Sequence, residues 1–294
     1  MKLEYNILWL DDNIEGFIDY EYVREIEDYL KENGFKANIK TVDNTTDFFG
    51  LLNSSFDLIL TDYNLSDEIN GREVVDKIRS TQYSVMTEIL FYTARVDLGD
   101  DSQRIDRVSF LETNASTDAH YRKVTSKTIE LIDLTIKKFQ NIVAMRGMIM
   151  HETSSLDVEF KDILKSVIEN KPDGLALEKI KKRFKKFNSD SNAEIDKIEE
   201  LDSLLLKIGA SHRWKGLKEN IDDGEIKNIL NVYEDEIITI RNKFAHAVLE
   251  EDKNGRNYFK DKSDGVDFNN EKCKTIRENI IRHKQNLDNL KKLI

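Results

Sequence analysis

Three short apolar runs in the first 95 residues each end in polar side chains, and this pattern constrains the fold more than any other feature. The runs and the polar residues that close them are 6–10 with Asp11 and Asp12, 57–61 with Asp62, and 87–92 with Thr93. Apolar runs of this length predict buried strands. In open parallel sheets, ligands bind at the carboxyl ends of the strands. The pattern therefore predicts that three carboxylates and a hydroxyl meet at one edge of a sheet, where they can bind one divalent cation.

The same part of the chain alternates between strand and helix patterns. Two further strands are expected at 37–41 and 108–112. Helices are expected near 18–33, 45–54, 71–80 and 99–105, with another beginning at about residue 116. Alternation with short connections predicts an α/β domain with a parallel sheet covered by helices on both faces.

After residue 115 the strand pattern stops and helical patterns follow. Residues 117–169 predict one long connecting helix, or two helices joined near Gly147. Further helices are expected at 175–187, 193–208, 213–219, 224–248 and 271–293, and 251–268 predict a loop or a short hairpin. The predicted fold class is therefore α/β plus all-α. Its parts are a sheet domain at 1–125, a connecting helix or helix pair at 116–169, and a helical bundle at 140–294.

Charge and composition limit the classes of function. Residues 1–140 hold 27 acidic and 16 basic residues, whereas 141–294 hold 29 of each. We expect the acidic first half to repel nucleic acid and the neutral second half to tolerate it. No apolar run approaches the roughly 18 residues of a membrane-spanning helix. A lone cysteine, Cys273, and a strand pattern close to the start without a signal peptide predict a cytoplasmic protein with no membrane partner.

The order of polar residues across about 4–125 resembles the receiver domain of two-component response regulators. The matching elements are the Asp11–Asp12 pair, Asp62, Thr93–Ala94 and the helix start Asn70–Glu73. The resemblance implies a flavodoxin-like fold with a five-stranded parallel sheet. It also implies a histidine kinase or another phosphodonor as a partner.

The resemblance gives the acidic residues their roles. Asp62 would accept the phosphoryl group. Mg²⁺ would be held by Asp11, Asp12, Asp62 and the backbone carbonyl of Asn64. These residue types suit the chemistry, because Mg²⁺ prefers oxygen ligands and offsets the charge of a phosphoryl group.

The sequence departs from the receiver pattern at one position that would respond to phosphorylation. By the resemblance, Thr93 and Phe110 would move on activation, although ordinary packing also explains Phe110. Receiver domains usually carry a lysine at the end of the fifth strand, and here that position falls on Thr113, or on Glu112 if the register slips by one. The domain is therefore expected either to be phosphorylated with an altered output or to be a pseudo-receiver.

The string Ile240–His246, Ile-Arg-Asn-Lys-Phe-Ala-His, is the most specific motif of the second half. It resembles the Arg-x4-His signature of HEPN domains, small helical bundles that usually dimerise and are often metal-independent ribonucleases. The resemblance covers about 140–294 and implies that Arg241, Asn242 and His246 are catalytic, with no cofactor. A histidine can transfer the proton of a ribose hydroxyl and an arginine can stabilise charge on the phosphate.

Helical spacing places the motif on an amphipathic helix. One apolar stripe consists of Leu230, Tyr233, Ile237, Ile240, Phe244 and Val248. A polar stripe nearly opposite consists of Asp235, Thr239, Asn242 and His246. Such a stripe either faces water or meets its symmetry mate across a dimer.

Other features of the second half have competing interpretations. Basic residues on one helix, which could bind RNA or simply face solvent, are Lys181, Lys182, Arg183, Lys185 and Lys186. Trp214 could stack on a base, but a core anchor is favoured. His151 is followed by Glu152 as in phospho-accepting histidines of sensor kinases, but an ordinary surface or packing histidine is favoured.

Together these features predict a two-component-type signalling protein whose receiver domain regulates a HEPN-type endoribonuclease acting as a homodimer on RNA. We expect no DNA partner. The alternative is a non-catalytic signalling adaptor, in which the helical domain serves dimerisation or partner binding.

Overall fold

The computed structural model divides the chain into two compact units, Lys2–Asn141 and Ile142–Ile294. The structure describes residues 3–65, 71–80, 85–94, 107–113, 116–139, 142–170, 175–187, 200–221, 224–246, 248–251, 257–260, 265–266 and 270–293. The helix expected at 99–105 lies outside these residues. None of the described helices combines the length and apolar character that crossing a membrane requires.

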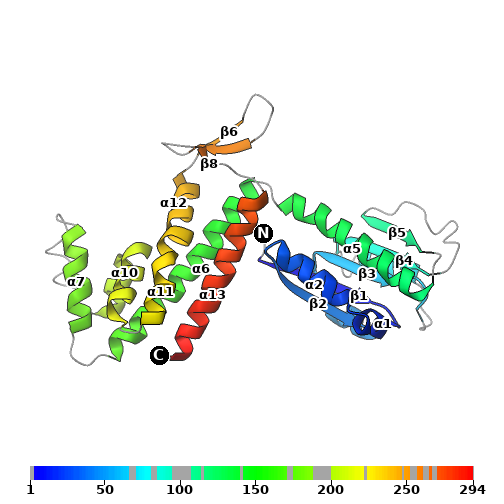
Figure 1. Cartoon of the computed structure of the whole chain (residues 1–294), viewed down its shortest axis with the longest axis horizontal. Helices are drawn as coiled ribbons and strands as arrows, with labels where there is room; N and C mark the ends of the chain where they lie inside the picture. Colours follow the sequence, from blue (N-terminus) through cyan, green and yellow to red (C-terminus); the bar gives the residue numbers. More distant parts are fainter. Residues whose placement is uncertain are drawn as a thin grey trace. The chain divides into compact units, whose positions relative to one another are not determined.

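The first unit is built on a five-stranded parallel sheet (Figure 1). Its strands are β1 Glu4–Leu10, β2 Lys36–Val42, β3 Leu58–Asp62, β4 Glu88–Thr93 and β5 Val108–Glu112. They lie in the order β2-β1-β3-β4-β5, and each neighbouring pair is parallel. This is the flavodoxin-like strand order, with the chain reversing its direction of winding beside β1. The five strands and the α/β fold predicted from the sequence are confirmed.

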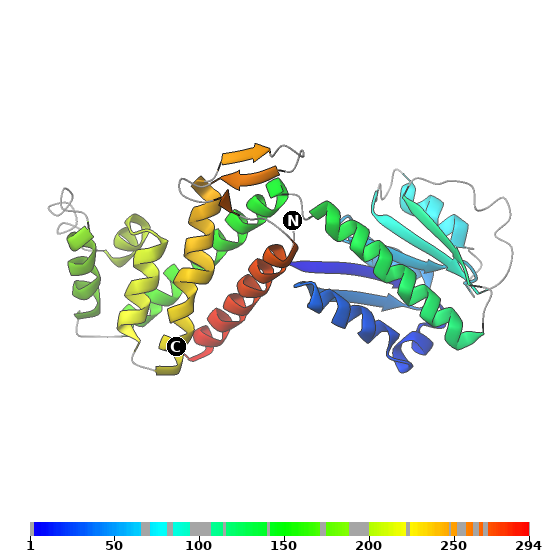
Figure 2. The same ribbon diagram turned by 45° about the horizontal axis from the view of Figure 1, so that its top comes forward.

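Helices cover both faces of this sheet, and Figure 2 shows α5 lying across one of them. The helices are α1 Ile14–Asp19, α2 Tyr22–Glu32, α3 Thr45–Leu51, α4 Gly71–Arg79 and α5 Thr117–Phe139. Buried side chains of α1, α2 and α5 form one hydrophobic core with the sheet, and those of α3 and α4 form the other. The helix predicted at 18–33 is found as α2, which begins later, at Tyr22. The separate helix α1 was not predicted; the left-handed backbone of Glu21 (φ 62°) separates it from α2.

Gly16 lets α1 and α5 approach closely beside the sheet. A Cβ atom at this position would lie 2.2 Å from the hydroxyl oxygen of Tyr121 in α5. Asn13, just before α1, donates from Nδ2 to the same hydroxyl at 2.8 Å. The loop after β1 is therefore attached directly to α5.

The second unit is largely helical, as predicted. Its helices are α6 Ile142–Glu169, α7 Leu175–Phe187, α9 Leu201–Lys207, α10 Ala210–Asn220, α11 Gly224–Tyr233, α12 Thr239–His246 and α13 Asn270–Leu293, with a π-helical turn η3 Glu234–Ile238 between α11 and α12. Strands β6 Val248–Glu251, β7 Asn257–Lys260 and β8 Gly265–Val266 form a small antiparallel sheet, which confirms the hairpin alternative for 251–268. The predicted break near Gly147 is wrong, because α5 ends at Phe139 and Gly147 lies within α6.

Packing in this unit centres on α6, which contacts α10, α12 and α13. Trp214 of α10 is 3% exposed and its indole Nε1 donates to the carbonyl of Leu230 at 2.7 Å. This confirms Trp214 as a core anchor, because a buried indole with a satisfied N–H has no face free for a base. Lys215 and Lys218 lie over its ring at 5.8 and 5.3 Å.

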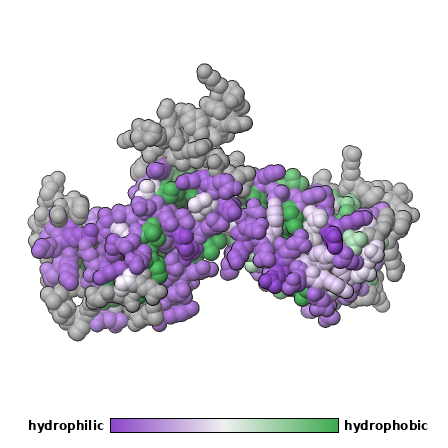
Figure 3. All heavy atoms as spheres, in the orientation of Figure 1, coloured by the Kyte–Doolittle hydropathy of each residue, from purple (hydrophilic) through white to green (hydrophobic). Residues whose placement is uncertain are grey.

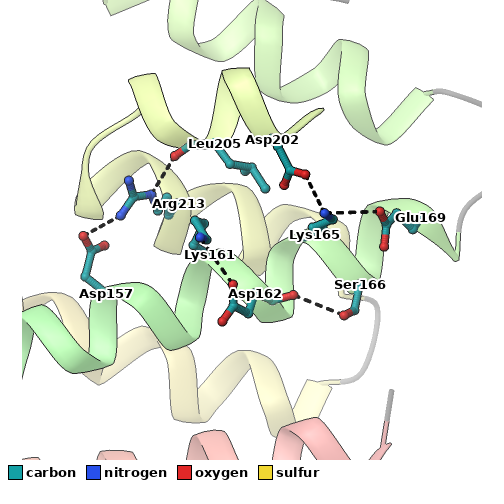
Figure 4. Close-up of polar contacts among 9 residues, drawn as sticks. All are labelled: Asp157, Lys161, Asp162, Lys165, Ser166, Glu169, Asp202, Leu205 and Arg213. Atoms are coloured by element: carbon teal, nitrogen blue, oxygen red, sulfur yellow. Dashed lines mark hydrogen bonds and ion pairs between the residues drawn. The ribbon is translucent and has the colours of Figure 1, made fainter. Parts of the chain in front are cut away.

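Polar contacts join α6 to α9 and α10 (Figure 4). Arg213 pairs with Asp157 at 2.5 Å and its Nε donates to the carbonyl of Leu205 at 3.0 Å. Lys165 pairs with Asp202 at 2.6 Å. Most of the surface visible in Figure 3 is hydrophilic, in keeping with the high charged fraction of the chain.

Candidate functional site

Three carboxylates meet at the carboxyl ends of β1 and β3. Asp11 and Asp12 directly follow β1, and Asp62 is the last residue of β3. One oxygen of each lies within 4.8 Å of the others. Asp11 is buried, Asp62 is half-buried and Asp12 is exposed, so the cluster is open to solvent on the side of Asp12.

Hydrogen bonds orient Asp11 from two sides. The backbone N–H of Asn13 donates to Oδ1 at 2.8 Å, and the hydroxyl of Tyr92 donates to Oδ2. Trp9 Nε1 in turn donates to the Tyr92 hydroxyl at 2.7 Å. Sequence reasoning missed Tyr92 and Trp9. The sequence did hold one signal for these two residues. Each carries a polar atom within an otherwise apolar strand, and a buried phenol or indole needs a hydrogen-bond partner.

Burial and mutual repulsion make the cluster electrostatically unfavourable on its own. Burial raises the pKa of Asp11. Burial, and then the negative charge of Asp11, raise the pKa of Asp62 to about 7, although the backbone N–H groups of Tyr63 and Asn64 act in the opposite direction. Within the part of the chain that the structure describes, Oδ1 of Asp62 is buried without a hydrogen-bond partner. A cation at this point would relieve both the repulsion and the missing contact.

Thr93 lies beside the cluster at the end of β4. Its side chain is 2% exposed and its Oγ1 accepts a hydrogen bond from Asn64 Nδ2 at 2.6 Å. Phe110 of β5 is half-buried and packs edge-on against Phe91, with ring centroids 5.4 Å apart. The side chain of Asn64 thus connects the loop after β3 to Thr93.

The end of β5 makes its contacts with α5. Thr113 is buried and its Oγ1 lies 2.7 Å from Nδ1 of His120, whereas Glu112 is exposed. Lys123 Nζ donates to the backbone carbonyl of Thr113 at 2.6 Å. Of the two residues considered for the lysine position, Thr113 is therefore the one whose side chain points inward.

In the second unit, α12 carries two of the three expected catalytic side chains near each other. Arg241 is half-buried, Asn242 is exposed, and Arg241 Nη2 donates to Asn242 Oδ1 at 3.4 Å. His246 is the last residue of α12, and its side chain lies outside the described residues. Arg146 of α6 donates from Nη2 to the carbonyl of Ala245 at 3.0 Å, which attaches the end of α12 to α6.

The predicted two-sided character of this helix is confirmed in part. Tyr233, Ile237 and Phe244 are buried and Asp235 and Asn242 are exposed, but Ile240 and Thr239 are both half-buried. The predicted extension of the helix to Val248 is wrong, because α12 ends at His246 and Val248 begins β6. The π-helical turn η3 was not predicted. Such single turns add one residue to a helix and occur frequently at functional sites.

The basic residues of α7 are partly engaged in ion pairs. Lys181 lies 3.4 Å from Glu178, and Arg183 pairs with Glu219. Lys182 is exposed and Lys185 is half-buried, while the side chain of Lys186 lies outside the described residues. His151 is exposed on α6, which matches the surface interpretation of this residue.

Solved structures of receiver domains are similar to less than half of this chain. No protein-family model and no curated protein matches the chain. Its structure is similar to a response regulator receiver domain from Clostridium thermocellum, with 16% identity and a TM-score of 0.32 over 46% of this chain and 95% of that one. It is also similar to a receiver domain protein from Methanospirillum hungatei, with 18% identity, a TM-score of 0.32, and coverage of 46% and 98%.

A third similar structure is the receiver domain of an HD domain-containing protein from Pseudomonas fluorescens. Its identity is 14% and its TM-score 0.33, over 48% of this chain and 96% of that one. At these identities and scores, the assignment of the fold rests on the strand order and register of the sheet itself.

Proposed function

We propose that the sheet unit is a receiver-type switch in which Asp62 accepts a phosphoryl group from a histidine kinase or another phosphodonor. The observation that carries this proposal is the convergence of Asp11, Asp12 and Asp62 at the carboxyl ends of two neighbouring parallel strands. In the proposed step, a carboxylate oxygen of Asp62 forms a bond to phosphorus while the bond between phosphorus and the donor breaks. The product is an acyl phosphate on Asp62.

The donor set fits Mg²⁺. Three carboxylate oxygens within 4.8 Å of one another suit a small cation that prefers oxygen ligands, and Oδ1 of Asp62 is buried without a hydrogen-bond partner among the described residues. Asp11, Asp12, Asp62 and the backbone carbonyl of Asn64 would hold the ion. When bound, Mg²⁺ offsets the charge of the phosphoryl group.

Thr93 and Thr113 are the residues through which the state of Asp62 would reach the rest of the unit. Thr93, already bonded to Asn64, would exchange this contact for an oxygen of the phosphoryl group. Thr113 would occupy the place of the usual receiver lysine, and its contact with His120 leads to α5. In this proposal Phe110 moves with Thr93.

We infer that the helical unit is the regulated part, a HEPN-like endoribonuclease that cleaves RNA without a metal. His246 would transfer the proton and Arg241 would stabilise the charge on the phosphate, with Asn242 orienting either group. The exposed position of Asn242 supports a site that faces a substrate or a second copy of the chain. Because α5 ends at Phe139 and α6 begins at Ile142, movement of α5 would be passed on through a short covalent link.

The switch is tested by incubating the whole protein with a small-molecule phosphodonor, in Mg²⁺ or in EDTA, and measuring phosphate by intact mass. We expect one phosphoryl group on the wild type in Mg²⁺ and none on Asp62→Asn. Asp28→Asn, which changes an exposed aspartate of α2, is the matched control and should behave as the wild type. Phosphate on Asp62→Asn, or none on the wild type, would contradict the proposal.

A further inference from the structure

Tyr92 is a buried residue beside the acidic cluster that has no part in the phosphoryl chemistry above. It lies in β4 directly before Thr93 and is 0% exposed. Its hydroxyl contacts Trp9 and Asp11, which belong to β1 and its carboxyl end. Because β3 separates β1 from β4 in the sheet, the Tyr92 side chain reaches across a strand to make these contacts.

The direction of this hydrogen-bonded chain follows from the chemistry of its three members. An indole N–H can only donate, so the Tyr92 oxygen accepts from Trp9 at 2.7 Å. An ionised carboxylate can only accept, so the phenolic proton points to Oδ2 of Asp11. Tyr92 therefore has its single proton committed to Asp11.

The hydrogen bonds that Asp11 accepts from described residues come from neutral groups. Tyr92 donates to Oδ2 and the backbone N–H of Asn13 donates to Oδ1 at 2.8 Å. Each carboxylate oxygen can accept two hydrogen bonds or ligand contacts, so with respect to the described residues both oxygens keep one position for a ligand. Neutral donors fix the orientation of Asp11 and leave its negative charge available for a cation.

Packing holds the phenol and the indole in place. Phe17 of α1 lies 4.7 Å from the ring of Trp9 and 6.2 Å from the ring of Tyr92, measured between ring centroids. Trp9 and Phe17 are, like Tyr92, 0% exposed. A close-packed interior restricts such rings to single rotamers, so the hydroxyl meets Asp11 at a fixed point.

We propose that Tyr92 is a positioning residue for the divalent cation, holding the Asp11 carboxylate in the orientation that binds it. This rests on the cation site of the proposed function and adds to it a group that acts through Asp11 without touching the ion. Hydrogen-bond partners of metal ligands typically change metal affinity by about 10- to 100-fold when they are removed. We expect Tyr92→Phe to weaken Mg²⁺ binding by a factor in this range.

Tyr5→Phe is the matched control for this substitution. Tyr5 is also 0% exposed, lies in β1 within the same hydrophobic core, and bonds through its hydroxyl to Thr135. It lies six residues before Asp11, which places it about 20 Å away along the strand. Loss of a buried hydroxyl alone would affect both variants, whereas a role at the cation would affect only Tyr92→Phe.

The experiment measures Mg²⁺ binding to the full chain by calorimetry for the wild type, Tyr92→Phe and Tyr5→Phe. The same titrations on Asp11→Asn and on Asp11→Asn/Tyr92→Phe complete a double-mutant cycle. We expect Tyr5→Phe to bind as the wild type, and Tyr92→Phe to have no further effect once Asp11 is changed. If Tyr92→Phe does not fold, Trp9→Phe takes its place, because it removes the hydrogen bond that Trp9 donates to the Tyr92 hydroxyl. Trp9→Phe should then weaken Mg²⁺ binding more than Tyr5→Phe does.

The outcomes separate the two proposals. A wild type that does not bind Mg²⁺ would overturn the proposed cation site itself. Wild-type binding with equal affinity in Tyr92→Phe, equal losses in Tyr92→Phe and Tyr5→Phe, or additive losses in the double mutant would overturn the role of Tyr92 alone.

Discussion

The two candidate sites differ in the burial of their side chains and in the distance along the chain between the residues that contact one another. In the sheet unit, Asp11 is 3% exposed and its oxygens are oriented by groups from β4 and from the loop after β1. In the helical unit, Asn242 faces solvent and accepts a hydrogen bond from Arg241, the residue beside it. The first site is organised by tertiary packing, and the second by the local geometry of one helix.

This difference bears on what each site needs in order to act. The acidic cluster is already assembled and its charges repel one another, so in the proposal a cation would complete it. In α12, Asn242 is exposed and Arg241 is half-buried, so in the proposal a second surface would complete this site. The predictions below test these two requirements.

The largest effect is expected at the helical site. His246→Ala should reduce RNA cleavage in EDTA by on the order of 10²–10⁴-fold, because general acid–base groups contribute about this much to rate. Cleavage of a mixed RNA pool by purified protein gives the measurement. His151→Ala, which removes an exposed histidine of α6, is the control and should leave the rate unchanged. Equal losses in both variants, or cleavage that survives His246→Ala, would remove the α12 motif from the chemistry.

A second prediction concerns pH at the acidic cluster. Burial and the charge of Asp11 raise the pKa of Asp62 from its usual 3.8 to about 7, so below that pH Mg²⁺ must displace a proton. We expect Mg²⁺ affinity to fall by up to about tenfold for each pH unit below about 7. Mg²⁺ titrations between about pH 5.5 and about pH 8 test this. An affinity independent of pH in this range would contradict a proton on Asp62.

The same shift fixes the sign of the stability change. Without the cation, the folded protein binds the Asp62 proton more tightly than the unfolded chain does. The contribution of Asp62 to the free energy of unfolding therefore decreases as pH rises from about 4 to about 7. Above about pH 7 this contribution no longer changes. Saturating Mg²⁺ should raise Tm more at pH 8 than at pH 5.5, a difference that Asp62→Asn should lack.

The smallest effect is expected on α7. Lys182→Ala should weaken RNA binding by about threefold, because Lys182 is exposed. It should also reduce the slope of log affinity against log salt concentration by about one. Lys181→Ala is the control and should have less effect, because Lys181 is paired with Glu178 at 3.4 Å. Binding titrations at two salt concentrations compare them. Equal effects in both variants would mean that α7 attracts RNA only through its overall positive charge and not through a contact of Lys182.

The sequence predicted the sheet well, because apolar runs ending in carboxylates are a local signal. All five strands lie within a few residues of their predicted positions, and Asp11, Asp12 and Asp62 meet as expected. Helix boundaries were less predictable. The break at Glu21 depends on a single left-handed residue, and the π-helical turn η3 interrupts a pattern that reads as one helix.

Contacts that join distant parts of the chain could not be predicted. Tyr92 meets Asp11 across 81 residues of sequence, and Arg146 meets Ala245 across 99. Each depends on which strand or helix becomes a neighbour, and on side-chain length, neither of which shows in local periodicity. The ion pair of Arg183 in α7 with Glu219 in α10 likewise appeared only with the fold.

Coupling between the two units is tested most directly by RNA cleavage before and after phosphorylation of Asp62. The whole protein is incubated with Mg²⁺ and a phosphodonor or with Mg²⁺ alone, then transferred to EDTA and assayed on the same RNA pool. The account predicts that treatment changes the cleavage rate of the wild type and leaves that of Asp62→Asn unchanged. Equal rates for treated and untreated wild type that carries phosphate, or no cleavage in either state, would contradict it.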